Sequence, residues 1–351
     1  MEVRHITDRQ AWQSFVDAAH PHTFLDSWSW GEFETANGHP SWRLGAYDEG
    51  PTNGKTGTLV GVVLVSKIVA RRATYLVWHH GPVVAPGASP ATVAAVLAAC
   101  TAESAAIARK EGCHFIRASS ILEDTAENRA LFAAQGFRPA PVHLHSELSW
   151  LLDLALSEDD LLKGMRKNTR YAIKKAEKDG VTIEKVESMD GFDRFWDIYM
   201  ETVKRQSFTP YPRHYLMNEF KTFLDAGEAA IFFASYQGTA IATAFIVYTR
   251  DSGFYHHGAS IHPFPGISGA ELLQWEAIRE ARRRGCREHN FWGVVPEEAT
   301  KHPWYGLSRF KRGFGGRELA LVHAQDLPVN PGRYWLNYLL ERYRTMRRGL
   351  S

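Results

Sequence analysis

The sequence predicts a mixed α/β (α+β) fold made of two tandem domains that share one plan. Helix and strand patterns alternate along all 351 residues, which favours the α/β class. A chain of this length usually divides into more than one hydrophobic core. The stretches AAIARKEGCHFIRAS (residues 105–119) and AIREARRRGCREHNFWG (277–293) both contain a helix pattern, a basic end, Gly-Cys and a strand pattern. They indicate an internal repeat of roughly 150 to 170 residues.

The composition limits the class of protein. Apolar residues make up 44% of the chain, and the net charge is only +2, so any basic surface is local rather than general. The three cysteines are odd in number and form no Cys-x-x-Cys pair, which indicates a reducing compartment. The N-terminus has no signal-peptide pattern, and no run of 18 or more apolar residues is present. We expect a soluble cytoplasmic protein.

The first domain is expected over residues 1–150. A turn at 49–57 joins the first two long strands, Ser89-Pro90 begins the long helix, and Gly112 and Gly136 end helices. The expected helices are 8–19, 30–36, 89–112 and 125–136, and the expected strands are 42–48, 58–70, 74–84, 113–120 and 142–154.

The second domain is expected over residues 151–321. Its strands include a three-stranded meander within 229–260 that turns at Gln237-Gly238 and at 251–253. The C-terminal segment, 322–351, is expected to be an amphipathic helix that packs back on the first domain. The other expected helices are 157–180, 189–206, 213–227 and 269–285, and the other strands are 181–187 and 288–294.

One predicted helix is strongly basic. MRKNTRYAIKKAEK (165–178) contains six cations and one acid, Glu177. Positions 167, 170, 174 and 178 share one helix face. A solvated face is the common explanation of a charge run, but the balancing acids are missing here. RNA backbone or lipid headgroups are therefore the better interpretation.

The segment HPWYGLSRFKRGFGG (302–316) combines aromatic residues, glycines and three cations. It is too rich in glycine to favour a helix. A lysine beside aromatic rings in a dry site can stabilise an oxyanion. The alternative, of about equal weight, is a strand-loop-strand that closes the second sheet.

Other motifs carry weaker signals. Gly266, Ser268 and Gly269 precede a helix whose amides could receive a phosphate, as in acetyl-CoA-dependent N-acetyltransferases, but the basic residue of that loop is missing. The histidine pairs near 79, 143 and 256 are expected in strands and lack metal-ligand spacing. We therefore expect no metal site and no cofactor.

Four stretches together resemble the Fem family of peptidoglycan aminoacyltransferases, in the family's order along the chain. They are SWSWGEFETANG (27–38), RKNTRYAIKKAEKDGV (166–181), IATAFIVYTRDSGFYHHGAS (241–260) and NFWGV with YGLSRFKRGFGG (290–316). The resemblance implies two tandem acetyltransferase-like (GNAT-like) domains of the short type, without a coiled-coil arm. It also implies transfer of Gly, Ala or Ser from aminoacyl-tRNA to the stem-peptide amine of a cell-wall precursor.

The resemblance also implies roles for individual residues. Lys311, beside Phe310, would act on the aminoacyl ester. For proton transfer our own candidates are His257 and Tyr215, and the substrate's own hydroxyl stays open as an alternative. The substrate-binding set is Trp30, Glu34, Tyr211, Arg213, Tyr255, Trp304 and Tyr305. The tRNA-binding set is Arg166, Lys167, Arg170, Lys174, Lys175, Lys178, Arg309 and Arg312.

Four positions depart from the short family members that use a UDP-linked precursor: Glu34, Ala118, Tyr211 and His257. These departures favour a lipid-linked or otherwise different acceptor. The expected partners are aminoacyl-tRNA, that precursor and the inner membrane face. We expect the protein to be a monomer. A CoA-dependent N-acyltransferase, a non-catalytic RNA- or lipid-binding module, and aminoacyl transfer to an acceptor outside the cell wall stay open as alternatives.

Overall fold

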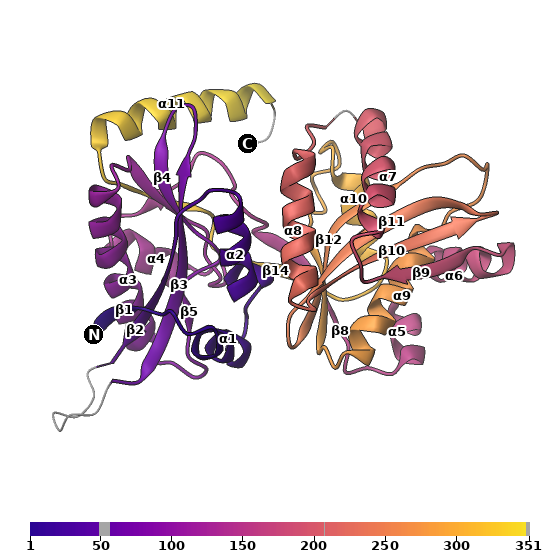
Figure 1. Ribbon diagram of the computed structural model, residues 1–351, viewed down its shortest axis with the longest axis horizontal. Helices are drawn as coiled ribbons and strands as arrows, with labels where there is room; N and C mark the ends of the chain where they lie inside the picture. Colours follow the sequence, from indigo (N-terminus) through magenta and orange to yellow (C-terminus); the bar gives the residue numbers. More distant parts are fainter. Residues whose placement is uncertain (49–56, 207, 349–351) are drawn as a thin grey trace. The chain divides into compact units, whose positions relative to one another are not determined.

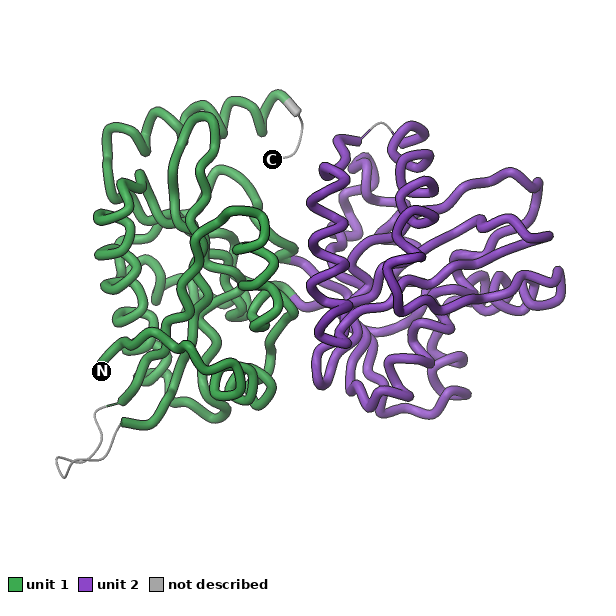
Figure 2. The backbone as a smooth tube through the Cα atoms, in the orientation of Figure 1, with its two compact units in different colours: residues 1–147, 320–351 green, residues 148–319 purple. Residues whose placement is uncertain are grey.

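The computed structural model describes residues 1–48, 57–206 and 208–348 (Figure 1). The chain forms two compact units, residues 1–147 with 320–351 (unit 1) and residues 148–319 (unit 2) (Figure 2). The chain therefore leaves unit 1 after Glu147 and returns to it at Ala320. Most of the expected turn at 49–57 lies outside the described residues.

Unit 1 is built on a sheet whose strands follow the order β1-β2-β3-β4-β6-β15-β7, with β5 paired to β3. Neighbours are antiparallel except β4 and β6, which are parallel. Its strands are β1 (Glu2–His5), β2 (Ser41–Tyr47), β3 (Leu59–Val69), β4 (Thr74–Trp78), β5 (Val83–Val84), β6 (Phe115–Ala118), β7 (Arg138–Pro139) and β15 (Gln325–Pro328). Its helices are α1 (Arg9–Ala18), the 3-10 turn η1 (Phe24–Asp26), α2 (Trp28–Ala36), α3 (Pro90–Lys110), α4 (Ala126–Ala134) and α11 (Pro331–Arg348).

The long helix α3 covers the core of unit 1. By length and hydropathy alone it could cross a membrane. However, Val96, Leu97 and Cys100 are fully buried in the cluster that also contains Leu76 and Ile116 of the sheet. This burial is that of a core helix.

Two expectations for unit 1 are wrong. The strand expected at 74–84 ends at Trp78, because His80 takes a positive φ of 45° that no strand accommodates. The expected helix at 322–351 begins only at Pro331, because proline fits the first turn of a helix. Residues 325–328 instead form β15, where Asp326 accepts two hydrogen bonds from Arg117 of β6.

Unit 2 is built on a seven-stranded sheet in the order β14-β8-β13-β12-β11-β10-β9. Its strands are β8 (Leu148–Asp153), β9 (Thr182–Val186), β10 (Ala229–Tyr236), β11 (Thr239–Tyr248), β12 (Ser252–Ser260), β13 (Glu288–Gly293) and β14 (Arg317–Ala320). Its helices are α5 (Glu158–Gly164), α6 (Lys167–Asp179), α7 (Gly191–Gln206), α8 (Arg213–Asp225), α9 (Ala270–Arg283) and α10 (Tyr305–Arg312).

The alternation of side chains along the strands of unit 2 gives two packed faces. Phe232 and Ile246 join residues of α6 and α9 in the main core cluster. On the other face Phe245 contacts Phe220 of α8, with ring centroids 5.2 Å apart, and Phe220 stacks with Phe192 of α7. The sheet is therefore covered by helices on both faces.

Two further expectations are corrected in unit 2. The single helix expected at 157–180 is two helices, because Met165 takes an extended conformation and ends α5. The segment 302–316, expected to be non-helical, forms α10. Only Gly306 lies inside that helix, while Gly313, Gly315 and Gly316 follow it, so the glycines end the helix rather than prevent it.

The two units repeat one topology. In each, four antiparallel strands lead to a helix, and the next strand is parallel to the fourth, as β4 and β6 are in unit 1 and β12 and β13 in unit 2. The connecting helices end at Gly112 (φ 67°) and Gly285 (φ 82°), where only glycine takes a positive φ without strain. The tandem α/β repeat predicted from the sequence is confirmed.

Candidate active site

A buried lysine lies at the end of strand β13. Lys311 comes from α10 and its side chain is only 5% exposed. Its Nζ donates a hydrogen bond to the carbonyl oxygen of Gly293 over 2.7 Å and lies 5.7 Å from the ring centroid of Tyr255. Burial lowers the pKa of Lys311 to about 7. The ammonium group is thus held in a dry place where its charge acts strongly on neighbouring atoms.

Two adjacent histidines lie on strand β12 because the strand contains a bulge. Phe245 pairs with His257 and the next residue, Ile246, pairs with Tyr255, so His256 is the extra residue. As a result both rings point to the same side, with centroids 3.9 Å apart. The bulge therefore turns two side chains of one strand toward one site.

Glu219 of α8 holds both histidines. Its two carboxylate oxygens accept hydrogen bonds from His256 Nε2 over 2.6 Å and from His257 Nε2 over 3.0 Å. Burial alone would raise the pKa of Glu219, but the two histidines outweigh it and hold the pKa at about 2. This bonding fixes the tautomer of His257 in which Nδ1 carries the lone pair.

Lys311 and the two histidines lie close enough for their charges to interact. Burial and the adjacent His257 lower the pKa of His256, and the charge of Lys311 lowers it further. Trp292 of β13 lies beside this pair, with its ring centroid 6.1 Å from that of His256. Because β12 and β13 pair only from Ser252 to Phe254, the site lies where the two parallel strands part.

Aromatic residues line the site between the histidines and α8. Tyr211 and Tyr215 stack with ring centroids 5.3 Å apart, and Tyr211 contacts His257 edge-on at 5.7 Å. Arg213 is an ion-pair partner of Asp193. The structure thus brings together Lys311, His257, Tyr255, Tyr211 and Tyr215 within unit 2.

The other predicted site residues belong to α10 and the residues before it, or to unit 1. Trp304 is 58% exposed, just before α10, and Tyr305 is the first residue of that helix, while Phe310 packs edge-on against Phe314. Trp30 and Glu34 belong to α2 of unit 1. There the Trp30 indole donates to His79, and Glu34 pairs with His39.

Apart from Arg312, the predicted tRNA-binding residues divide into two groups. Arg166, Lys167, Lys174, Lys178 and Arg309 are exposed. Arg170 instead donates to carbonyl oxygens at the end of α5, and Lys175 bonds Asp179 and the carbonyl of Gly266.

Arg312 does not fit its predicted contact with tRNA. It is 4% exposed, donates to the carbonyl of Val295 and to Glu318, and lies over the Trp150 ring at 5.2 Å. A guanidinium with these internal partners stabilises the segment around α10 rather than offering charge at the surface.

Reasoning from the sequence missed Glu219. The pattern of α8 contains the signal, since Leu216, Phe220 and Phe223 are all buried and position 219 falls on the same helix face. An acid among buried apolar positions needs a partner, and here the partners are the two histidines.

The glycine segment before α9 shows a weak likeness to a phosphate site. Gly269 caps the helix without a side-chain hydrogen bond, but Glu271 stands in the first turn and bonds Ser268 over 3.1 Å. A carboxylate at this end of the helix competes with an incoming phosphate.

Comparisons with known proteins agree with this architecture. Residues 163–312 match the family model of an acetyltransferase (GNAT) domain, which covers α6 to α10 and thus the whole lysine–histidine site. In solved structures, the fold of FemX matches with a TM-score of 0.79 at 18% identity, over 96% of this chain and 99% of that one. A tandem GNAT protein from the clavulanic acid biosynthesis pathway matches with a TM-score of 0.56 at 12% identity, over 93% of this chain and 99% of that one. The protein is therefore a tandem GNAT-fold protein.

Within this class the chain resembles the Fem family. The aminoacyltransferase FemB of Staphylococcus epidermidis is 31% identical over 90 residues, which are 26% of this chain. The match spans 22% of the length of that relative. The resemblance to the Fem family that the sequence indicates is thus confirmed, by a local likeness in sequence and by a likeness in fold along nearly the whole chain.

Proposed function

We propose that this protein transfers an aminoacyl group, Gly, Ala or Ser, from aminoacyl-tRNA to the stem-peptide amine of a peptidoglycan precursor. The observation that carries the proposal is the buried Lys311 beside two histidines clamped by Glu219. This arrangement suits acyl transfer to an amine, because it combines a cation for an oxyanion with a base for a proton.

The reaction needs no nucleophile from the enzyme, because the tRNA ester is already activated. The acceptor amine attacks the ester carbonyl carbon, and the carbonyl oxygen becomes an oxyanion that the Lys311 ammonium stabilises. One such donor is worth about 3 to 4 kcal/mol. His257 Nδ1 accepts the proton that leaves the amine. The C–O bond to the ribose then breaks, and the ribose oxygen leaves with a proton, for which Tyr215 is a candidate donor.

The donor is proposed to lie along the exposed cations of α6. Lys167, Lys174 and Lys178 are exposed on this helix, and Arg166 immediately precedes it. Clustered cations of this kind bind a phosphate backbone with a strong dependence on salt. Residues 166–178 lie in the GNAT-matched region, so the proposed tRNA surface and the transfer site belong to the same unit.

A CoA-dependent N-acyltransferase is the second candidate, and the GNAT likeness is the observation that favours it. It would place the CoA pyrophosphate at the start of α9. There Glu271 occupies the first turn, and Lys175 is bonded to Asp179 and to the Gly266 carbonyl. These contacts favour aminoacyl-tRNA over CoA as the donor.

A lipid-linked acceptor is proposed because unit 1 exposes an apolar stripe. On α11, Leu336, Leu339, Leu340, Tyr343 and Met346 are 41% to 66% exposed. The opposite face is the one that packs inward: Tyr334 is buried against Phe115, at 5.5 Å between centroids, and Glu341 bonds Arg117.

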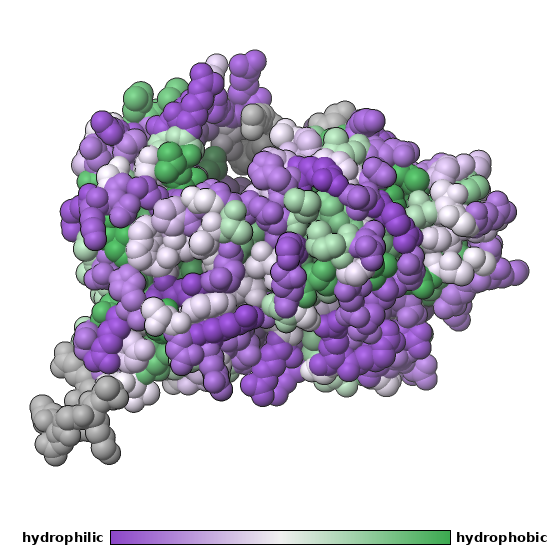
Figure 3. Space-filling model, viewed as in Figure 1, coloured by the Kyte–Doolittle hydropathy of each residue, from purple (hydrophilic) through white to green (hydrophobic). Residues whose placement is uncertain are grey.

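Charge complementarity suggests an anionic bilayer as the partner of this stripe. Arg333, Arg342, Arg344 and Arg347 are exposed on the same helix, and the space-filling view shows hydrophobic and hydrophilic residues side by side over α11 (Figure 3). Each such cation adds about 1 kcal/mol near an anionic leaflet. We place the protein in the cytoplasm, with α11 in peripheral contact with the inner membrane face.

Vesicle sedimentation tests the membrane contact. The wild-type protein should sediment with phosphatidylglycerol-rich vesicles and much less with phosphatidylcholine vesicles. The double variant Leu336→Glu/Leu339→Glu should lose this binding, while Leu156→Glu, which alters an exposed leucine of unit 2, should keep it. Equal sedimentation of all three proteins would exclude α11 as the contact.

The donor is tested with a pool of tRNAs charged with radiolabelled amino acids, offered with lipid-linked and UDP-linked precursors in separate reactions. The proposal predicts label in the lipid-linked precursor and loss of transfer after RNase treatment. Transfer from acetyl-CoA in parallel reactions, with charged tRNA inert, would instead establish the second candidate.

A further inference from the structure

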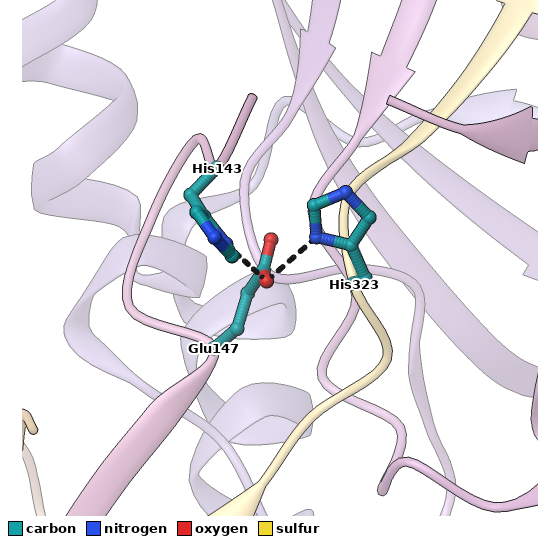
Figure 4. Close-up of side chains that lie close together, drawn as sticks. All are labelled: His143, Glu147 and His323. Atoms are coloured by element: carbon teal, nitrogen blue, oxygen red, sulfur yellow. Dashed lines mark hydrogen bonds and ion pairs between the residues drawn. The ribbon is translucent and has the colours of Figure 1, made fainter. Parts of the chain in front are cut away.

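His143, Glu147 and His323 form a cluster in unit 1 that takes no part in the proposed transfer (Figure 4). Both histidines point the same ring nitrogen, Nδ1, at one carboxylate oxygen. The distances to Glu147 Oε2 are 2.5 Å from His143 and 2.8 Å from His323. All three residues lie outside the strands, in the segments that join β7 to β8 and β14 to β15.

The backbone fixes Glu147 and His323 firmly. The amide of Ala324 donates to the second carboxylate oxygen of Glu147 over 2.8 Å, and the amide of Leu321 donates to the Glu147 carbonyl over 2.7 Å. His323 Nε2 lies 2.8 Å from the carbonyl oxygen of Ala140. Two of the three side chains are therefore oriented before any ligand arrives.

The hydrogen bonds of His323 require a proton or a metal ion between its Nδ1 and the Glu147 carboxylate. A carbonyl oxygen only accepts, so Nε2 of His323 must carry the hydrogen that Ala140 receives. In a neutral ring Nδ1 then carries a lone pair, and this lone pair faces a carboxylate oxygen 2.8 Å away. Two such groups attract one another only if a proton or a metal ion lies between them.

We propose that this cluster binds a divalent cation of the zinc type through His143 Nδ1, His323 Nδ1 and Glu147 Oε2. Imidazole nitrogens and a carboxylate oxygen are ligands that zinc prefers. The bond from a ligand histidine to a backbone carbonyl, seen here at Ala140, is the usual outer support of such sites. The ligand atoms need to separate to roughly 3.4 Å around a tetrahedral metal with bonds near 2.1 Å. The His143 side chain, 65% exposed, can move away from the carboxylate, and the contact of 2.8 Å between His323 and Glu147 has to lengthen by about 0.6 Å. The exposed side of His143 leaves a coordination position for water.

The second histidine–glutamate cluster differs in this respect. At Glu219 each histidine bonds a different carboxylate oxygen, over 2.6 and 3.0 Å, so the carboxylate satisfies two separate donors without any ion between them. Of the two clusters found among the described residues, the one at Glu147 is therefore the better metal site.

Metal binding to the metal-free, full-length protein tests the proposal. Zn²⁺ is titrated against a chromophoric chelator, and Co²⁺ is added in parallel because its visible absorption reports the coordination sphere. We expect one tight equivalent in the wild-type protein, at least tenfold weaker binding in His143→Gln and in His323→Gln, and unchanged binding in His262→Gln, which alters an exposed histidine of unit 2. Because His143 is mostly exposed, its variant should fold normally.

Three outcomes would overturn the proposal. These are the absence of Zn²⁺ binding at micromolar concentrations, wild-type binding in both cluster variants, and loss of the equivalent only in Glu219→Gln. In the first case the cation in the cluster is a proton. The first two outcomes leave the proposed aminoacyl transfer untouched, because it uses other residues, whereas the third would place the metal at the histidines of the transfer site and count against their role as a base.

Discussion

Replacing Lys311 with methionine should abolish transfer and at the same time make the protein more stable below pH 7. Burial lowers the pKa of this lysine from its ordinary value of 10.5 to about 7. At about 1.4 kcal/mol per pKa unit, keeping the ammonium charged inside the fold destabilises the protein by about 5 kcal/mol. Methionine has a similar length and carries no charge, but it leaves the Gly293 carbonyl without its donor, which costs about 1 to 3 kcal/mol. A net gain of about 2 to 4 kcal/mol is expected at pH 6.

The sign of the pH dependence follows from the same values. Between about pH 7 and pH 10.5 the unfolded wild-type chain binds the lysine proton and the folded protein does not, so wild-type stability rises with pH across this window. The advantage of the variant should therefore be largest at pH 6, vanish between about pH 8 and pH 10, and turn into a deficit of about 1 to 3 kcal/mol above pH 10.5, where only the lost hydrogen bond to Gly293 remains.

Denaturant unfolding at pH 6, 8 and 10 measures this difference, with Lys204→Met, an exposed lysine of α7, as the matched control. Turnover should fall at least hundredfold in Lys311→Met. Near-normal turnover, or a stability difference that does not change with pH, would refute the reasoning.

The remaining predictions concern tRNA, the histidine clamp and the bulged strand. Lys174→Glu/Lys178→Glu should weaken tRNA binding and reduce its salt dependence, while Lys204→Glu should not; filter binding at several salt concentrations measures both. Glu219→Gln leaves one histidine without its acceptor, so kcat should fall more than tenfold with the fold retained by circular dichroism; unchanged kcat and an unchanged pH profile would contradict the clamp. Gly258→Ala would place a Cβ atom 1.9 Å from a tyrosine hydroxyl and should lower thermal stability, whereas Gly164→Ala meets nothing within 4 Å and should not.

The sequence predicted the repeat because each half carries the same local signals. Gly112 and Gly285 end equivalent helices, and buried strands follow both. The errors arose where long-range pairing decides the structure. The sequence of residues 325–328 resembles a segment that leads into a helix, yet these residues pair with β6. The pairing places Asp326 against Arg117, and these two residues are 209 positions apart in the chain.

The candidate site was predictable only in part. Lys311 and His257 stand in segments whose composition is unusual, so the sequence singled them out. Arg312 has the same composition around it, but its burial depends on Trp150 and Val295, which come from distant strands and loops. For the same reason, the sequence did not predict the cluster of His143 and His323, since its two histidines are distant in the chain and show no local metal-ligand spacing.

The central claim is that the acyl donor is aminoacyl-tRNA, and a competition experiment in one tube tests it most directly. The protein is mixed with lipid-linked precursor, charged tRNA and acetyl-CoA together, and the precursor is then analysed by mass spectrometry. We predict that the mass of the precursor increases by one aminoacyl residue, and that this product is absent with Lys311→Met. An increase by an acetyl group alone would contradict the account and leave only the tandem GNAT fold in place.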